Sequence, residues 1–216
     1  MVVARFPRAY CDANREKWEL DPEMFEGALP DWVNSKSARV GAGLGTIARV
    51  VASGEHIYRH KLHFAEAQMR MERCWQPFHD ALLTEIGATR AVFGQCLLVD
   101  CHSMPTNSQS HSGRVDVILG DAHGTTCSAR VVRGVEELLV GLGYRVKRND
   151  PYAGGYITRH YGRPREGVHA LQIEICRSIY MDESRIERLA GFVDVRARFT
   201  QLVAELVASR GFLPEL

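Results

Sequence analysis

Short apolar runs alternate with helix-period segments over most of the chain, and this alternation is the feature that most constrains the fold. The expected strands lie at residues 91–99, 115–119, 144–147 and 169–176, and the expected helices lie at 64–82, 128–143 and 183–209. Strands that alternate with helices predict an α/β fold, with one mixed, mostly parallel sheet flanked by helices on both faces. Residues at the carboxyl ends of such strands are the first candidates for a functional site.

The remaining segments are expected to be mainly loops that connect these strands and helices. Residues 1–60 carry many Pro and Gly residues and little periodicity, which predicts loops and short helices. Residues 149–164 form a Gly- and Pro-rich segment that we expect to be a loop, and Pro77 should kink the helix at 64–82. With 216 residues, the chain is long enough to form one domain (1–216) with a real hydrophobic core.

Charge and cysteine content exclude several classes of protein. The 27 Lys and Arg residues balance 26 Asp and Glu residues, so no global field attracts nucleic acid or an anionic membrane. The six cysteines form no C-x-x-C pair and are expected to be reduced thiols. No apolar run reaches the length of a membrane span, and the N-terminal residues lack the apolar region of a signal peptide. We therefore expect a cytoplasmic protein that binds neither nucleic acid nor a membrane.

The first candidate site follows the strand expected at 91–99. This strand leads into Asp100 and His102, which we expect in the turn at its end. A neutral imidazole there can bind a metal ion, and a neighbouring carboxylate can fix its tautomer. A structural, hydrogen-bonded histidine is the alternative.

Glu174 is the second candidate, because it is an isolated carboxylate in an otherwise apolar strand. Burying such a group is costly unless it has a partner or a chemical role. Partly apolar surroundings raise the pKa of a carboxylate, which suits a general base. An ion pair with Arg177 or with another internal base is the alternative.

Asn14 and Arg15 form a third polar group. An amide beside a planar guanidinium can hold a substrate carboxylate with two parallel hydrogen bonds. Ordinary surface residues are the alternative here.

Four motifs give the chain a family resemblance. They are RAYCDANR at 8–15, DCHSMP at 100–105, NDPYAGGY at 149–156 and QIEICRSIYMDE at 172–183. In this order they resemble the N-formylglutamate amidohydrolases, zinc-dependent relatives of the metallocarboxypeptidase fold. The resemblance implies a zinc-carboxypeptidase-like sheet and hydrolysis of the amide bond of an N-formyl amino acid, with N-formyl-L-glutamate the expected substrate.

The resemblance also implies roles for particular residues. His102 is similar to the zinc-binding histidine of the family, and Glu174 to its catalytic glutamate. Asn14 and Arg15 are similar to the pair that binds the substrate carboxylate. Tyr156, in the segment that closes over the substrate, is expected to contact it.

One segment of the family pattern is not found in the sequence. The family carries an early strand and a P-H-x-G-like segment before the motif at 8–15, and this segment supplies a first zinc-binding histidine and further acidic ligands. We expect either that the start codon is assigned too late, or that the chain is a shortened relative with altered or lost activity. If the chain as given binds zinc, His111 or His123 are candidates for completing the site. The alternatives are a non-catalytic relative that keeps an anion-binding pocket without zinc, and an enzyme for another N-acyl amino acid.

Overall fold

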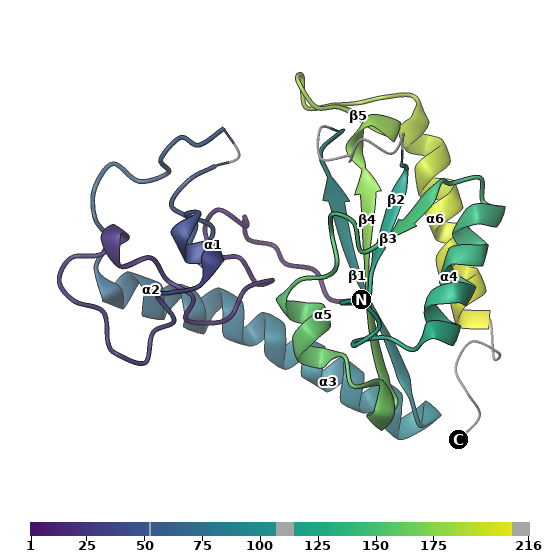
Figure 1. The fold of residues 1–216 in the computed structure, drawn as a ribbon, viewed down its shortest axis with the longest axis horizontal. Coiled ribbons are helices and arrows are strands. Elements are labelled where there is room, and N and C mark those ends of the chain that lie inside the picture. Colours follow the sequence, from purple (N-terminus) through teal and green to yellow (C-terminus); the bar gives the residue numbers. More distant parts are fainter. Residues whose placement is uncertain (52, 107–114, 209–216) are drawn as a thin grey trace. The chain divides into compact units, whose positions relative to one another are not determined.

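The computed structural model describes residues 1–51, 53–106 and 115–208. Within the chain, two compact units can be distinguished, residues 1–88 and residues 89–216. Helix α3 (Gln76–Phe93) runs across the boundary between them (Figure 1). A single domain over the whole chain stays a prediction, and each unit is described by itself.

The first unit consists mainly of loops with short helices. Its elements are η1 (Pro22–Met24), α1 (Ala38–Gly41), α2 (Phe64–Arg70), the π-helical turn η2 (Met71–Trp75) and most of α3. Isolated bridges join Glu19 to Asn34 and Phe25 to Leu62, so the loops are tied by single backbone pairings rather than by a sheet. The expectation for residues 1–60 is confirmed.

The helix expected at 64–82 is longer and irregular. Helical structure is continuous from α2 through η2 to the end of α3 at Phe93. The π-helical turn ends two residues before Pro77, whose nitrogen cannot donate a hydrogen bond, so the irregularity accompanies this proline. Residues 91–93 therefore belong to a helix and not to the expected strand. Val92 and Phe93 are 73% and 71% exposed, so these apolar residues do not mark a core.

The second unit contains the sheet. Its elements are β1 (Cys96–Met104), β2 (Val117–Gly120), α4 (Ala129–Gly141), β3 (Val146–Arg148), α5 (Tyr156–Tyr161), η4 (Pro164–Glu166), β4 (Val168–Cys176), η5 (Arg177–Ile179), β5 (Met181–Asp182), β6 (Glu187–Arg188) and α6 (Gly191–Ala208). The strand order of the main sheet is β1-β4-β2-β3, with β1 parallel to β4, β2 parallel to β3, and β2 antiparallel to β4. Strands β5 and β6 form a separate small hairpin.

Helices cover both faces of this sheet, as Figure 1 shows, with α4 and α6 on one side and α5 on the other. Odd-numbered residues of the central strands, among them Leu119, Leu171 and Ile173, are fully buried against α4 and α6. Because side chains alternate along a strand, the even-numbered residues face α5. The expected fold class, a mixed and mostly parallel sheet flanked by helices, is confirmed.

Three element boundaries differ from the expectation. The first strand begins five residues late and continues to Met104, because nine residues pair in register with β4. The expected loop at 149–164 contains α5, whose six residues are too few for a clear helical period. The last helix begins at Gly191, and the preceding residues form η5 and the β5–β6 hairpin.

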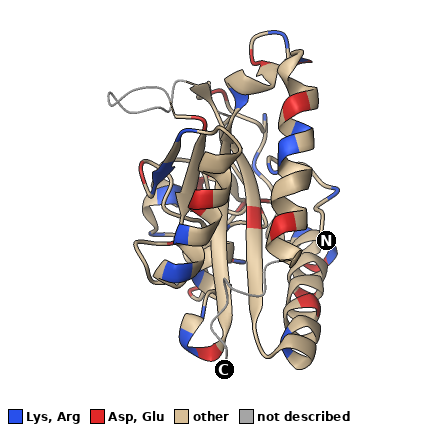
Figure 2. Cartoon of the chain, turned by 90° about the vertical axis from the view of Figure 1, so that its right-hand side faces the viewer, with Lys and Arg blue, Asp and Glu red and all other residues tan. Residues whose placement is uncertain are grey.

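The surface carries charges of both signs. Acidic and basic residues are interspersed along the helices and loops (Figure 2), in keeping with a formal net charge of +1. Among the residues that the structure describes, no helix is long and apolar enough to span a membrane.

Candidate active site on the β1–β4 face

Two neighbouring strands present polar side chains on the α5 side of the sheet. In the parallel β1–β4 register, Asp100 pairs with Gln172, and His102 pairs with Glu174. Register partners on adjacent strands point to the same face, so these four side chains form a two-by-two group. The structure thus brings together His102 and Glu174, which are 72 positions apart in the sequence.

The burial of Glu174 follows from the pattern of its strand. Leu171 and Ile173 are buried against α4 and α6, and this fixes the even-numbered residues on the opposite face. On that face Glu174 is only 6% exposed and Gln172 is 4% exposed. Buried carboxylates need hydrogen-bond partners, and Gln172 supplies one.

Gln172 donates from Nε2 to Glu174 Oε1 at 2.8 Å, and its own Oε1 accepts from the Gly155 backbone N–H at 2.8 Å. The ion pair between Glu174 and Arg177, which was the alternative, is not found, because Arg177 contacts other residues. Arg177 Nε instead donates to Ser103 Oγ at 3.2 Å, and its Nη1 lies 3.5 Å from Glu183 Oε2. A neutral amide, rather than Arg177, therefore orients this carboxylate.

His102 and Asp100 form a second pair on the same face. The distance from His102 Nε2 to Asp100 Oδ1 is 2.9 Å, and the two side chains are 16% and 10% exposed. Both residues lie within β1 and not in a turn after it, which corrects the sequence-based expectation. A carboxylate on one imidazole nitrogen fixes the tautomer and orients the other nitrogen, which is the usual arrangement around a metal-binding histidine. A purely structural histidine would also fit this contact.

A loop before α5 packs against the same face. A side chain at Gly120 would collide with it, because an added Cβ would lie 2.7 Å from Gly154 N and 2.8 Å from Ala153 C. The Ala122 backbone N–H donates to Ala153 O at 2.6 Å and holds the loop in place. The loop leads directly into Tyr156, the first residue of α5, whose ring stacks on His160 at 4.8 Å.

In the first unit, Asp12 organises the segment that holds Asn14 and Arg15. Its carboxylate accepts hydrogen bonds from Arg8 Nη2 at 2.6 Å and from the Asn14 backbone N–H at 2.9 Å. The Ala13 carbonyl of this segment also has a side-chain partner, since His79 Nε2 lies 2.9 Å from Ala13 O. Asp12 and Asn14 are 7% and 6% exposed, so the segment is buried, and Asn14 is not the ordinary surface residue of the alternative interpretation.

Arg15 is held by backbone acceptors. Its Nε donates to Leu44 O at 3.0 Å and its Nη1 donates to Asn14 O at 2.9 Å. Trp75 Nε1 donates to the Arg15 carbonyl at 3.0 Å and fixes its backbone. Burial lowers the pKa of the guanidinium from its ordinary value, although an arginine stays charged at neutral pH. A pre-oriented guanidinium of this kind is suited to bind a carboxylate.

A complete metal site is not found in the part of the chain that the structure describes. Among residues 1–51, 53–106 and 115–208, no group of three or more His, Cys, Asp or Glu side chains is arranged so that it could hold a metal ion. His111 lies outside the described residues. His123 sits in the turn after β2, with φ of 57°, and its backbone N–H donates to Asn149 Oδ1 at 3.4 Å. A catalytic zinc takes three protein ligands, and His102 is one candidate.

Gln172 was not among the site residues expected from the sequence. The sequence does contain a signal for this residue. Gln172 is a polar residue two positions before Glu174 in an apolar strand, and side chains two positions apart lie on the same face of a strand. Glu174, His102 and Tyr156 lie in the second unit, and Asn14 and Arg15 lie in the first.

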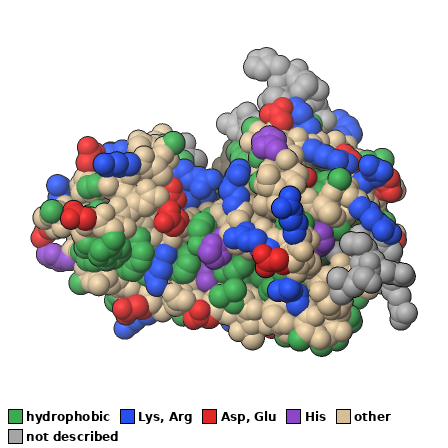
Figure 3. Space-filling model, turned by 60° about the horizontal axis from the view of Figure 1, so that its bottom comes forward, with side chains coloured by type: hydrophobic (Ala, Val, Ile, Leu, Met, Phe, Trp, Pro, Cys, Tyr) green, Lys and Arg blue, Asp and Glu red, His purple; other side chains and the backbone are tan. Residues whose placement is uncertain are grey.

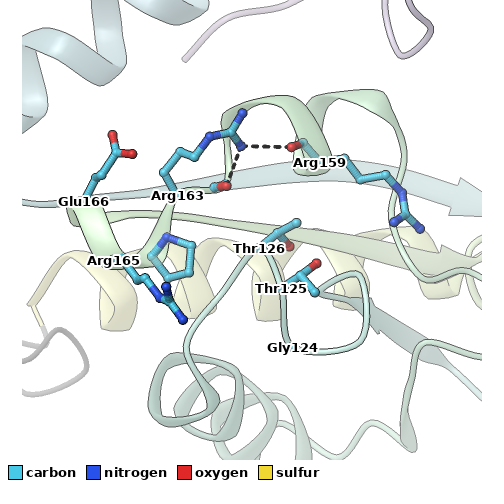
Figure 4. Close-up of a pocket in the computed structure, with 9 residues that line it drawn as sticks. Gly124, Thr125, Thr126, Arg159, Arg163, Arg165 and Glu166 are labelled. Carbon is cyan, nitrogen blue, oxygen red and sulfur yellow. Dashed lines mark hydrogen bonds between the residues drawn. The ribbon is translucent and has the colours of Figure 1, made fainter.

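A basic hollow lies at the other end of the strands. It has a volume of about 660 Å³ and is lined by arginines from α5 and η4 and by the turn after β2. Figure 3 shows Lys and Arg side chains gathered on this face of the second unit. In Figure 4 the guanidinium groups of Arg159, Arg163 and Arg165 point in different directions, and Arg163 Nη1 donates to the Arg159 carbonyl at 3.0 Å. Because these groups do not converge on one point, the hollow is not a second candidate site.

The fold and this geometry define an α/β protein with a buried carboxylate and a buried amide beside a half-buried imidazole, all on one face of a mostly parallel sheet. The family model described as N-formylglutamate amidohydrolase matches residues 1–181. The chain belongs to this family.

Individual relatives agree with this assignment. The solved structure of N-formylglutamate amidohydrolase from Ralstonia eutropha JMP134 superposes with a TM-score of 0.87 at 38% identity, over 93% of this chain and 74% of that one. N-formylglutamate deformylase from Pseudomonas putida is 30% identical over 189 residues, which are 85% of this chain and 65% of the relative. The Pseudomonas aeruginosa enzyme of the same name is 34% identical over 147 residues, 66% of this chain and 55% of the relative. The chain thus spans less than two thirds of these two relatives.

Proposed function

We propose that this protein hydrolyses the formyl amide of N-formyl-L-glutamate to formate and L-glutamate. The observation that carries the proposal is the buried Glu174, oriented by Gln172 and in register with His102, in a chain of this family. Water adds to the formyl carbon, the C–N bond breaks, and the amino nitrogen leaves with a proton. Relatives named as deformylases support the choice of substrate.

Glu174 is the proposed proton carrier. A general base takes a proton from the attacking water and returns it to the leaving nitrogen. The carboxylate is buried, which strengthens its interaction with a proton donor, and its direction is fixed by the hydrogen bond from Gln172. One carboxylate can serve both steps because the proton that it gains in the first is the one that it donates in the second.

Asn14 and Arg15 are proposed to bind a carboxylate of the substrate. The guanidinium supplies charge and fixed geometry, and the buried segment that starts at Asp12 holds it in one orientation. Tyr156, at the start of α5, is proposed as a further substrate contact.

We propose zinc as the metal, with His102 as one ligand. Asp100 engages Nε2 and would fix the tautomer and orientation of the imidazole. A bound zinc would supply a Lewis acid for the carbonyl and lower the pKa of a water molecule. The residues that the structure describes do not by themselves make up a three-ligand site.

A substrate panel tests the proposed function. We expect N-formyl-L-glutamate to be hydrolysed with a kcat/KM at least about 10-fold above that for N-acetyl- and N-succinyl-L-glutamate, because a site that fits a formyl group has less room for the larger acyl groups. Release of formate and free amine by the full chain is the measurement. Preference for a larger acyl group would indicate an enzyme for another N-acyl amino acid. Binding of N-formylglutamate without turnover of any substrate would indicate a non-catalytic relative.

Metal content tests the zinc proposal. We expect the purified chain to hold zinc by elemental analysis, and Asp100→Asn to weaken zinc binding about 10- to 100-fold in a chelator competition, because the amide no longer fixes the imidazole tautomer. Asp194→Asn changes an exposed carboxylate on α6 and should leave zinc affinity unchanged. Equal zinc affinity in Asp100→Asn and the unmodified chain would contradict the role of Asp100, and a zinc-free chain would contradict the proposal.

A further inference from the structure

The Gln172 side chain has one defined orientation. Its Oε1 accepts from a backbone N–H, that of Gly155, which can only donate. The amide nitrogen must therefore face Glu174, and Gln172 Nε2 donates to Glu174 Oε1. A buried glutamine bonded on both sides cannot rotate without leaving a polar group unsatisfied.

Gly155 is itself held on both sides. Its carbonyl accepts from Thr158 Oγ1 at 3.0 Å, and Thr158 is fully buried. The loop before it lies against Gly120, where no side chain could be accommodated. The contact between Gly155 and Gln172 thus joins a fixed loop to the strand that carries Glu174.

We propose that Gln172 is a positioning residue, which transmits the fixed position of the 151–155 loop to the Glu174 carboxylate through its amide. This inference rests on the proposed function, because it assigns a role to a neighbour of the proposed proton carrier. Glu174 Oε1 accepts from Gln172 Nε2, and this hydrogen bond fixes the direction of the carboxyl group on the sheet face.

Kinetics of Gln172→Met give the first test. Methionine keeps the length and approximate volume of glutamine, but it cannot donate to Glu174, and its thioether sulfur is only a weak acceptor for the Gly155 N–H. We expect kcat for N-formylglutamate to fall about 10- to 100-fold, with KM within about 3-fold, because a misdirected base slows proton transfer without changing substrate binding. A kcat within about 3-fold of the unmodified chain would overturn the proposal.

Thr158→Val is the matched control. It removes the other side-chain hydrogen bond to Gly155 at an equally buried position, and this bond does not involve Glu174. We expect its kcat to stay within about 3-fold of the unmodified chain. If it lost as much activity as Gln172→Met, general loosening of the loop would explain both variants, and the positioning role would be wrong. Melting temperatures of both variants show whether they fold.

A second measurement needs no turnover. In ¹H–¹⁵N spectra we expect the Gln172 Nε2 protons to exchange slowly with water, and to shift and exchange faster in Glu174→Ala, which removes their acceptor. Unchanged signals in Glu174→Ala would overturn the proposal. If the unmodified chain hydrolysed nothing, the proposed function would fail, and this measurement would still decide whether Gln172 holds Glu174.

Discussion

Glu174→Gln should lower kcat for N-formylglutamate by about 10²- to 10⁴-fold, the contribution typical of a general acid–base residue. Glutamine has nearly the same shape, and its Oε1 can still accept from Gln172 Nε2, so the local structure should be kept. It cannot take a proton from water at neutral pH. Because substrate contacts are unchanged, KM should stay within about 3-fold, and steady-state kinetics on the full chain separate the two effects.

Glu137→Gln is a suitable control, because Glu137 is an exposed carboxylate on α4, away from the polar face of the sheet. Its kcat should remain within about 2-fold of the unmodified chain. Near-normal turnover by Glu174→Gln would remove Glu174 from the reaction. Unchanged zinc content and melting temperature in this variant would show that any loss is chemical and not structural.

Arg15→Ala should weaken substrate binding first. Removing one partner of a desolvated, charge-assisted hydrogen-bond pair costs about 2–4 kcal/mol, which corresponds to roughly 30- to 1000-fold in affinity. We therefore expect a rise of this size in the KM for N-formylglutamate, with a smaller fall in kcat. Arg15→Lys should recover part of the loss, because lysine restores the charge without the planar pair of donors.

Two controls separate binding from folding at Arg15. Lys36→Ala removes an exposed positive charge from the same unit and should leave KM unchanged. Arg15→Ala also loses the side-chain bond to Leu44 O, so its melting temperature should be measured with its kinetics. An unchanged KM in folded Arg15→Ala would exclude Arg15 from substrate binding.

Local patterns in the sequence were sufficient to predict several of the helices and strands. Helix α4 begins after Ser128, whose side chain accepts from the Val131 N–H, as the alternation of polar and apolar residues indicates. Strand β4 was expected at 169–176 and is found at Val168–Cys176. These elements are encoded locally, by a capping residue and by strong periodicity.

Other elements depended on contacts distant in the sequence. β1 continues to Met104 because it pairs with β4. Nothing in the sequence of residues 100–104 by itself predicts this pairing. α5 is short, and its first residue follows a loop whose position depends on the absence of a side chain at Gly120. Such tertiary contacts override local preference.

The sequence by itself determined the family, the α/β class and the identity of the candidate residues, because motifs and hydrophobic periods are properties of consecutive positions. Only the tertiary structure decided that Asp100 binds His102 Nε2, that Gln172 and not Arg177 orients Glu174, and that His102 and Glu174 are neighbours. The physical reason is strand register. A shift of one residue would turn every side chain of β4 to the opposite face, and the buried core of Leu171 and Ile173 is what prevents that shift.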